Sequence, residues 1–448
     1  MAAVIEDKDA LRSSFERFAQ AHVASEPAWL RARRTAAFAR FVEKGLPGPH
    51  DEAWRHTPLA PLVRTQFAPA DPASSPAAAD LARVPREVTR GAEIVFVNGR
   101  FAPELSRLGA GAGEGLHVTS LRAALQSDGA SLEPLLDRAL PRDGSVFSDL
   151  NQAFPDDGAC VTLAPGAVVR EPIHVVHVSV PGATPTAAYQ RTLLLAGRGS
   201  EARVVETFAG PDAGAYLVNA VTELLLEDGA RLDHCKLQRE GERGLHLATL
   251  AVRLGRDARF SDRAISLGAG LARNEIEVLF DGAGGECVLD GLFLVDGRRV
   301  CDTHSRIDHA QPHCTSRQLY KGILDQQARG VFNGLVRVRP GAQKTDAAQT
   351  NRNLLLSRDA IVHSTPQLEI LADDVKCKHG STTGQLDATA LFYLRSRGIG
   401  EAAARGLLTW AFASDLLRGV PVEALRQAAE AALQAQLRGV ADVREALS

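Results

Sequence analysis

The chain has 448 residues, of which 45% are hydrophobic and 23% are charged. That balance is typical of a soluble globular protein of two or three domains and excludes a chain that is disordered throughout. The formal net charge is only −3, which excludes bulk electrostatic attraction to nucleic acid or to an anionic membrane surface as the basis of function.

The sequence carries no sign of export or of membrane insertion. No uninterrupted apolar run approaches the roughly 20 residues that cross a bilayer. Residues 1–9 have neither the basic start nor the apolar stretch of a secretory signal peptide. The six cysteines are widely spread and form no dense disulfide framework. We therefore expect reduced thiols in a cytoplasmic protein.

The first 65 residues are predicted to form an N-terminal helical region. Leu11, Phe15 and Phe18 recur at helical spacing, and a second apolar set follows before Gly45. A glycine at that place is typical of the end of a helix.

Residues 66–155 are predicted to be a linker followed by a mixed α/β segment. The Pro-, Ala- and Ser-rich stretch 68–79 is typical of a long loop. A strand and turn are expected at 92–99, and a helix is expected at 117–140.

Residues 156–387 are predicted to form a β core. Short Val-, Leu- and Ile-rich segments are separated by small turn clusters, and no long amphipathic helix fits between them. The alanines of six turns are separated by 63, 28, 70, 14 and 18 residues, mostly near multiples of 14 to 16. This spacing favours a parallel β-helix of stacked short strands, with a β-sandwich as the alternative. The six turn alanines are Ala167, Ala230, Ala258, Ala328, Ala342 and Ala360.

Residues 388–448 are predicted to return to helices. Segments 401–418 and 421–437 have helical periodicity, and Pro421 opens the second of them. They would form core or a cap over the open end of the β stack, or bind a partner.

Several familiar catalytic motifs are missing. The sequence has no GxxxxGK[ST] loop, so ATP binding by a P-loop is not expected. It also lacks GxSxG, HExxH and CxxC motifs.

The strongest candidate site lies in the segment DDVKCKHG, residues 373–380. On a strand, Cys377 and His379 project from one face about 7 Å apart. A thiolate and an imidazole suit zinc, copper or iron–sulfur chemistry. We expect Lys376 and Lys378, which flank the thiol, to lower its pKa. Only two ligands are supplied here, so the others would come from elsewhere in the fold or from another chain. The alternative is an inert Cys and a surface His.

A second cluster, residues 301–314, holds three histidines together with Cys301 and Cys314. Its spacing fits neither a zinc finger nor a facial triad, and Pro312 interrupts any helix that would align the side chains. We favour an interpretation in which Asp308 and His309 form hydrogen bonds inside the solenoid turns.

Five longer segments carry a family resemblance. Together they resemble the SufB/SufD family of iron–sulfur cluster assembly proteins, and the DVKCKHGSTTGQLD segment resembles its SufD type. The segments are GLPGPHDEAWRHTPL (45–59), IDHAQPHCTSRQLYKGILDQQARGVFNG (307–334), AQKTDAAQTNRNLLLS (342–357), TPQLEILADDVKCKHGSTTGQLD (365–387) and FYLRSRGI (392–399).

The resemblance implies a fold and a function. The fold would be a right-handed parallel β-helix between helical ends. The chain would be a non-catalytic scaffold subunit that pairs with a SufB-like subunit through the β-helix and binds a SufC-like ABC ATPase through its C-terminal helices. The complex would assemble nascent Fe–S clusters. In isolation the chain would form a homodimer through the surface meant for its homologous partner.

The resemblance also implies where the sites lie. His379, with Cys377 as its partner in the motif, would lie at the interface with the SufB-like subunit. The chain alone would bind no cofactor stably, and iron or an Fe–S cluster would bind transiently at that interface. The ATPase would dock on residues 390–440, with Leu407, Trp410 and Leu417 as the candidate contacts.

Two other functions remain as alternatives. One is a structural β-helix homo-oligomer without metal chemistry. The other is a β-helix enzyme acting on polysaccharide, which would need paired carboxylates and aromatic platforms. The absence of Trp between residues 55 and 409 and the missing export signal argue against the enzyme.

Overall fold

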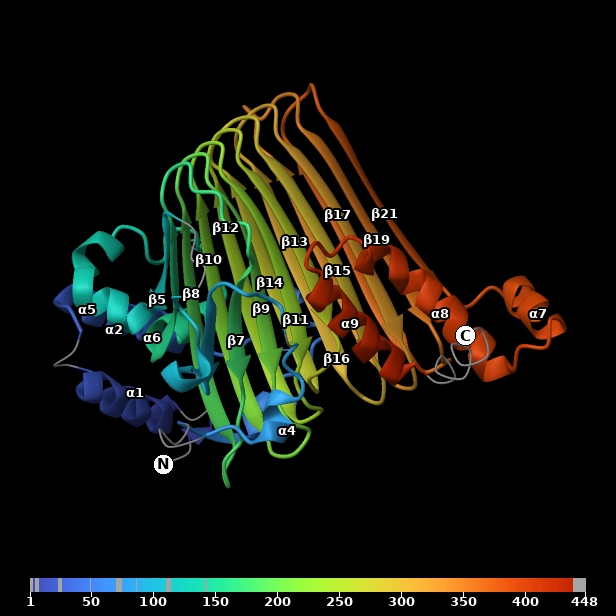
Figure 1. Cartoon of the computed structure of the whole chain (residues 1–448), viewed down its shortest axis with the longest axis horizontal. Coiled ribbons are helices and arrows are strands. Elements are labelled where there is room, and N and C mark those ends of the chain that lie inside the picture. Colours follow the sequence, from blue (N-terminus) through green and yellow to red (C-terminus); the bar gives the residue numbers. More distant parts are fainter. Residues whose placement is uncertain are drawn as a thin grey trace.

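The centre of the molecule is a stack of strands in two parallel sheets, seen in the computed structural model of Figure 1. From β6 onward consecutive strands alternate between the sheets, and each strand from β8 to β21 pairs in parallel with the strand two positions earlier in the chain. This arrangement confirms the predicted parallel β-helix and contradicts the alternative of a sandwich. The structure describes residues 3–4, 8–22, 26–48, 50–69, 75–85, 87–109, 114–141 and 143–437.

The two sheets have the following strands in the described part of the chain. The first sheet contains β1 (Ala3–Val4), β2 (Gln66–Pro69), β5 (Leu116–Ser120), β6 (Asp157–Leu163), β8 (Thr186–Ala196), β10 (Tyr216–Leu226), β12 (Gly244–Leu254), β14 (Leu271–Phe280), β16 (Val300–His309), β18 (Arg329–Val338) and β20 (Ile361–Ile370). The second contains β3 (Glu93–Val97), β4 (Arg100–Phe101), β7 (Ile173–Val178), β9 (Glu201–Ala209), β11 (Arg231–Arg239), β13 (Arg259–Ser266), β15 (Glu286–Val295), β17 (Thr315–Leu324), β19 (Asp346–Leu355) and β21 (Lys376–Gly384).

The predicted turn clusters form corners between the sheets. Gly166 and Gly229 have φ angles of +73° and +71°, a conformation that glycine adopts without steric cost. The alanines that follow them, Ala167 and Ala230, are buried, as are the other four turn alanines. A small side chain at each corner lets the chain cross from one sheet to the other without opening the interior.

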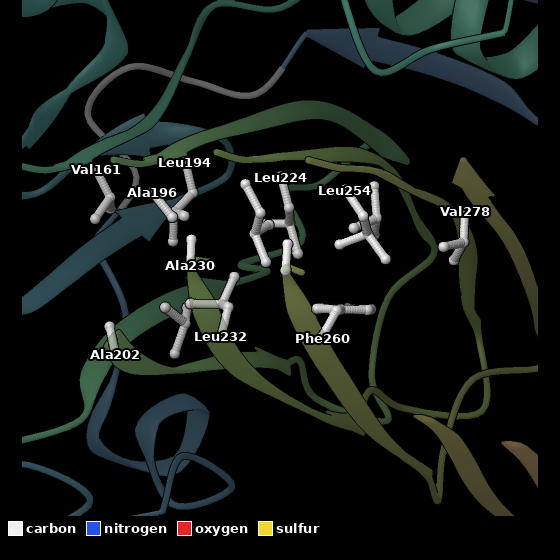
Figure 2. Packing of buried hydrophobic residues seen from close by; sticks show 14 of the residues in the cluster. Val161, Leu194, Ala196, Ala202, Leu224, Ala230, Leu232, Leu254, Phe260 and Val278 are labelled. Carbon is white, nitrogen blue, oxygen red and sulfur yellow. The ribbon is translucent and has the colours of Figure 1, made fainter. Parts of the chain in front are cut away.

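In-register pairing stacks the apolar core into columns. Leu194, Leu224, Val252 and Val278 are successive register neighbours in the first sheet, and all four are buried. Figure 2 shows this cluster, with Phe260 and other side chains of the second sheet opposite. Each inward position of one coil therefore packs on the equivalent position of the next.

The helices cover the first coils and one face of the second sheet. The expectation that the C-terminal helices cap the open end of the β stack is wrong, because α8 and α9 pack on the outer face of the second sheet. In Figure 1, α2, α5 and α6 lie at the end where the β stack begins, α8 and α9 lie against the second sheet, and α7 projects past β21. Helices are α1 (Lys8–His22), α2 (Ala28–Lys44), α3 (Ala60–Arg64), α4 (Ala78–Leu81), α5 (Leu121–Leu132), α6 (Val146–Ala153), α7 (Ala388–Ser396), α8 (Glu401–Leu417) and α9 (Glu423–Gln436), with short 3-10 turns at Glu52–Trp54 and Pro103–Leu105. No helix of the described ranges is long and apolar enough to cross a membrane.

The segment 66–155 is more than a linker. Its strands β2 and β3 pair in parallel with β8 and β7, so the segment contributes to both sheets. The helix predicted over 117–140 is wrong at its start, because β5 pairs with β6 there and α5 begins only after the N-cap Ser120. Residues 70–74 of the predicted Pro/Ala/Ser loop lie outside the described residues.

The interior also holds a buried ionic cluster. His234 lies between Asp262, 2.7 Å from its Nδ1, and Glu206, 3.2 Å from its Nε2. Burial lowers the pKa of His234, but the hydrogen bonds to both carboxylates outweigh burial and raise the pKa to about 9. Because an unfolded histidine has a pKa of about 6.5, this imidazolium stabilises the fold fully below that pH.

We predict that Leu224→Ala lowers the free energy of unfolding by about 2 to 5 kcal/mol, since it leaves a cavity in the buried column. Leu335→Ala is the matched control, because Leu335 is only partly buried on the outer face of β18. Urea unfolding of both variants measures the difference, and equal losses would contradict the assigned inward column.

We also predict that the pH dependence of stability changes in His234→Gln. In the native chain the contribution of His234 is lost as the pH rises from 6.5 to about 9, which costs roughly 1 to 3 kcal/mol. The variant lacks that loss, so the difference in unfolding free energy between the two proteins should shrink as the pH rises. A difference that stays constant from pH 6 to pH 9.5 would contradict the charged assignment.

Candidate interfacial metal site at the last coil

The last coil brings Cys377 and His379 to one face of β21. The strand pairs in parallel with β19, in the register Ala347 to Cys377 and Gln349 to His379. Both β19 neighbours are buried and face the interior. The two candidate ligands therefore lie on the inner face of the β-helix at its open end, and the predicted shared face is confirmed.

The thiol of Cys377 lies in apolar surroundings. It is half-buried and packs against a cluster that includes Ala347 and Leu368. Burial raises its pKa above the usual value, and the charge of Asp346 adds to that effect. The expectation that Lys376 and Lys378 lower this pKa is wrong, because strand alternation turns both lysines to the opposite, outer face.

His379 lies beside polar neighbours. It is exposed, and the buried side chain of Gln349 is its register partner. One step further along the strand, Ser381 Oγ donates to Ser364 Oγ at 2.8 Å, and Ser364 Oγ donates to Asn351 Oδ1 at 2.7 Å. The last coil thus combines an apolar half around the cysteine with a polar half around the histidine.

This polar half is not among the features predicted from the sequence. Its signal is the unbroken polar run QTNRN at 349–353, of which a strand turns residues 349, 351 and 353 toward one face. In an apolar interior such a run would be costly, so it marks a stretch where buried groups bond one another.

The site is incomplete within one chain. Cys377 and His379 offer one sulfur and one nitrogen donor, and the described residues contain no group of three or more His, Cys, Asp or Glu placed to hold a metal ion. A closed four-ligand site would therefore need donors from a second chain.

Both sheets end at this site in an unpaired edge. In the described part of the chain, β20 pairs only with β18, and β21 pairs only with β19. Ile361, Ile370 and Leu371 are 45%, 40% and 50% exposed along or beside β20. Long, exposed, apolar edge strands are surfaces that bind another chain.

The second cluster does not assemble into a site. Alternation along β16 turns Cys301 and His309 into the interior and His304 to the outer face. The interpretation that Asp308 and His309 form hydrogen bonds inside the solenoid turns is confirmed for His309, whereas Asp308 lies on the outer face and bonds the exposed Arg339. These bonds are His309 Nε2 to Ser316 Oγ at 2.9 Å and Arg339 Nη2 to Asp308 Oδ2 at 2.7 Å.

The three candidate contacts for an ATPase differ in exposure. Leu417, the last residue of α8, is fully buried against the second sheet, so it does not face a partner. Leu407 and Trp410 are partly exposed. The most exposed aromatic side chains lie on α7, where Phe392 and Tyr393 are 73% and 56% exposed. Residues 438–440 of the predicted dock lie outside the described residues.

Comparisons with known proteins cover almost the whole chain. The SufBD core domain of the SUF system for FeS cluster assembly matches residues 178–412, and the SufBD N-terminal region matches residues 6–175. The iron–sulfur cluster assembly protein SufD of Escherichia coli is 32% identical over 402 residues, which are 89% of this chain and 91% of that protein. The SufBD family protein slr0076 of Synechocystis is 34% identical over 398 residues, 85% of each chain. The chain therefore belongs to the SufBD family of iron–sulfur cluster assembly proteins.

Proposed function

We propose that this chain is the SufD-type, non-catalytic scaffold subunit of a complex that assembles Fe–S clusters. Its partners in this proposal are a homologous SufB-like subunit and a SufC-like ABC ATPase. The similarity to the SufD protein of Escherichia coli over nine-tenths of both chains supports the type of subunit. The observation that carries the proposal is the half-complete donor pair at the unpaired edge of both sheets.

The pairing surface of the proposal is the edge formed by β20 and β21. A homologous subunit with the same β-helix would present an equivalent edge, and main-chain hydrogen bonds between the two would continue the sheets. In isolation, the chain would pair with itself through this edge because the two partners share a fold. The exposed apolar side chains of β20 would then be buried.

In this proposal the iron or the nascent cluster is a substrate of the complex and binds only transiently. His379 supplies an imidazole nitrogen, and the SufB-like subunit supplies the ligands that this chain lacks. Cys377 is the weaker ligand of the two, since its raised pKa keeps the thiol protonated at neutral pH. The family's ATPase would supply ATP hydrolysis, for which this sequence has no P-loop.

The ATPase dock of the proposal lies on the C-terminal helices. Leu407 and Trp410 remain its contacts on α8, and we add Phe392 and Tyr393 of α7. Two neighbouring aromatic side chains that protrude from the body of the molecule are well suited to anchor a partner, since aromatic residues dominate interface energetics.

The alternative is a structural homo-oligomer without metal chemistry, and the same unpaired edge supports it. The two proposals differ in what the chain retains from its own cells. A tagged chain that recovers an ABC ATPase and a homologous β-helix subunit is a scaffold subunit, whereas a structural homo-oligomer recovers neither.

We predict that His379→Ala lowers the maturation of Fe–S enzymes in cells that depend on this chain by tenfold or more, since a first-sphere ligand is lost. The activity of an Fe–S enzyme per unit of its polypeptide measures the effect. Lys378→Ala is the matched control, because Lys378 is the adjacent residue on the opposite face. Unchanged maturation in His379→Ala would remove the site from the proposal.

We predict that the double change Phe392→Ser and Tyr393→Ser lowers ATPase recovery in an affinity pull-down at least tenfold, because two interface anchors are removed. Recovery of the homologous subunit should stay unchanged. Val168→Ser is the control, since Val168 is an apolar side chain that is 58% exposed elsewhere on the surface. Full ATPase recovery by the double variant would place the dock elsewhere.

A further inference from the structure

A short chain of side-chain amides runs through the interior toward the last coil. Gln318 of β17 and Gln349 of β19 are register neighbours, and both are buried. Gln349 Nε2 donates to Gln318 Oε1 at 2.7 Å. Gln318 Nε2 donates in turn to Ser305 Oγ at 2.5 Å. Every link of this chain donates away from the open end of the β-helix.

This polarity fixes the orientation of the outermost amide. Gln318 uses both its oxygen and its nitrogen, so the amide of Gln349 presents its nitrogen to Gln318. The amide is planar, and its oxygen therefore points away from Gln318. That oxygen is buried and has no hydrogen-bond partner among the described residues. Sixteen buried side-chain atoms of the described residues lack such a partner, and Gln349 Oε1 is the one that belongs to the register neighbour of the candidate ligand His379. A donor that reached this oxygen would remove the cost of leaving it unpaired.

The fold makes room for this amide on the opposite sheet. Gly334 of β18 lies across the interior from Gln349, and a Cβ atom at Gly334 would be only 2.3 Å from Gln349 Nε2. A larger residue at position 334 would push the amide out of its place. The hydrogen bond to Gln318 thus holds the Gln349 side chain, and the lack of a side chain at Gly334 leaves the space that it occupies.

The next side chain on the open side is that of His379, the register partner of Gln349 in β21. We propose that Gln349 is the positioning residue for His379. In the proposed arrangement the exposed His379 side chain turns so that one imidazole N–H donates to Gln349 Oε1, which selects a single tautomer and holds the ring. The other ring nitrogen is then left unprotonated and free to bind the iron-containing substrate.

The positioning role rests on the amide chain and the register of β19 and β21, whereas its use for iron binding rests on the proposed function. The two parts can therefore fail separately. Gln349→Leu removes the acceptor at similar size, and Gln349→Glu keeps an acceptor oxygen in place. Gln367→Leu is the matched control, because Gln367 is a partly buried glutamine of the same last coil on its outer face.

The test uses the full-length chain without metal, labelled with 15N in its histidines. The imidazole signals of His379 are identified by their loss in His379→Ala. We expect one tautomer in the native chain and in Gln367→Leu, averaged tautomers in Gln349→Leu, and a single tautomer again in Gln349→Glu. The same tautomer populations in the native chain and in a folded Gln349→Leu would overturn the proposal.

Maturation of Fe–S enzymes in cells is the second readout. Loss of an outer-sphere partner typically costs 10- to 100-fold in metal affinity or activity, so Gln349→Leu should lower maturation about tenfold and Gln349→Glu should restore part of it. If His379→Ala leaves maturation intact while the tautomer depends on Gln349, the proposed function fails and the positioning role stands. If Gln349→Leu does not fold, the Gln349→Glu spectrum decides, since averaged tautomers in that variant would overturn the positioning role.

Discussion

The whole structure depends on parallel, in-register pairing between successive coils. Each strand from β8 to β19 copies the inward and outward alternation of the preceding strand in its own sheet, because parallel neighbours in register point equivalent side chains the same way. A column of inward residues therefore runs along the molecule. Where the column is apolar it forms the core, as at Leu224, and where it is polar it forms chains of hydrogen bonds, as at Gln318.

The same constraint leaves one end of the β stack open. The backbone hydrogen-bonding groups of each coil pair with those of the next coil. The last coil is the exception, because no further coil follows it in the described chain. At that end β20 and β21 are paired along one edge only, and the inward columns end at exposed side chains such as His379. The first coils differ because helices α2, α5 and α6 pack over them. One end of the stack is thus closed by the chain itself, and the other is suited to a second chain.

Much of the buried polarity is paired. His234 is held by two carboxylates, and Ser364 of the last coil bonds Asn351 of the coil before it. Among the buried side-chain atoms of the described residues that lack a partner, the oxygen of Gln349 is the one that lies beside the candidate ligand in register. In our proposal this unpaired acceptor connects the buried amides of the β-helix to the candidate ligand His379 at its open edge.

The sequence by itself determined the architecture, since the turn spacing indicated stacked strands and the family resemblance named the β-helix. It also determined that Cys377 and His379 share a face, because strand alternation is local. Only the tertiary structure decided what surrounds them. The pKa of Cys377 is set by burial against a neighbouring coil, 30 residues earlier in the chain, and not by the adjacent lysines. The burial of Leu417 and the pairing of β5 with β6 likewise depend on partners distant in sequence, which local patterns do not encode.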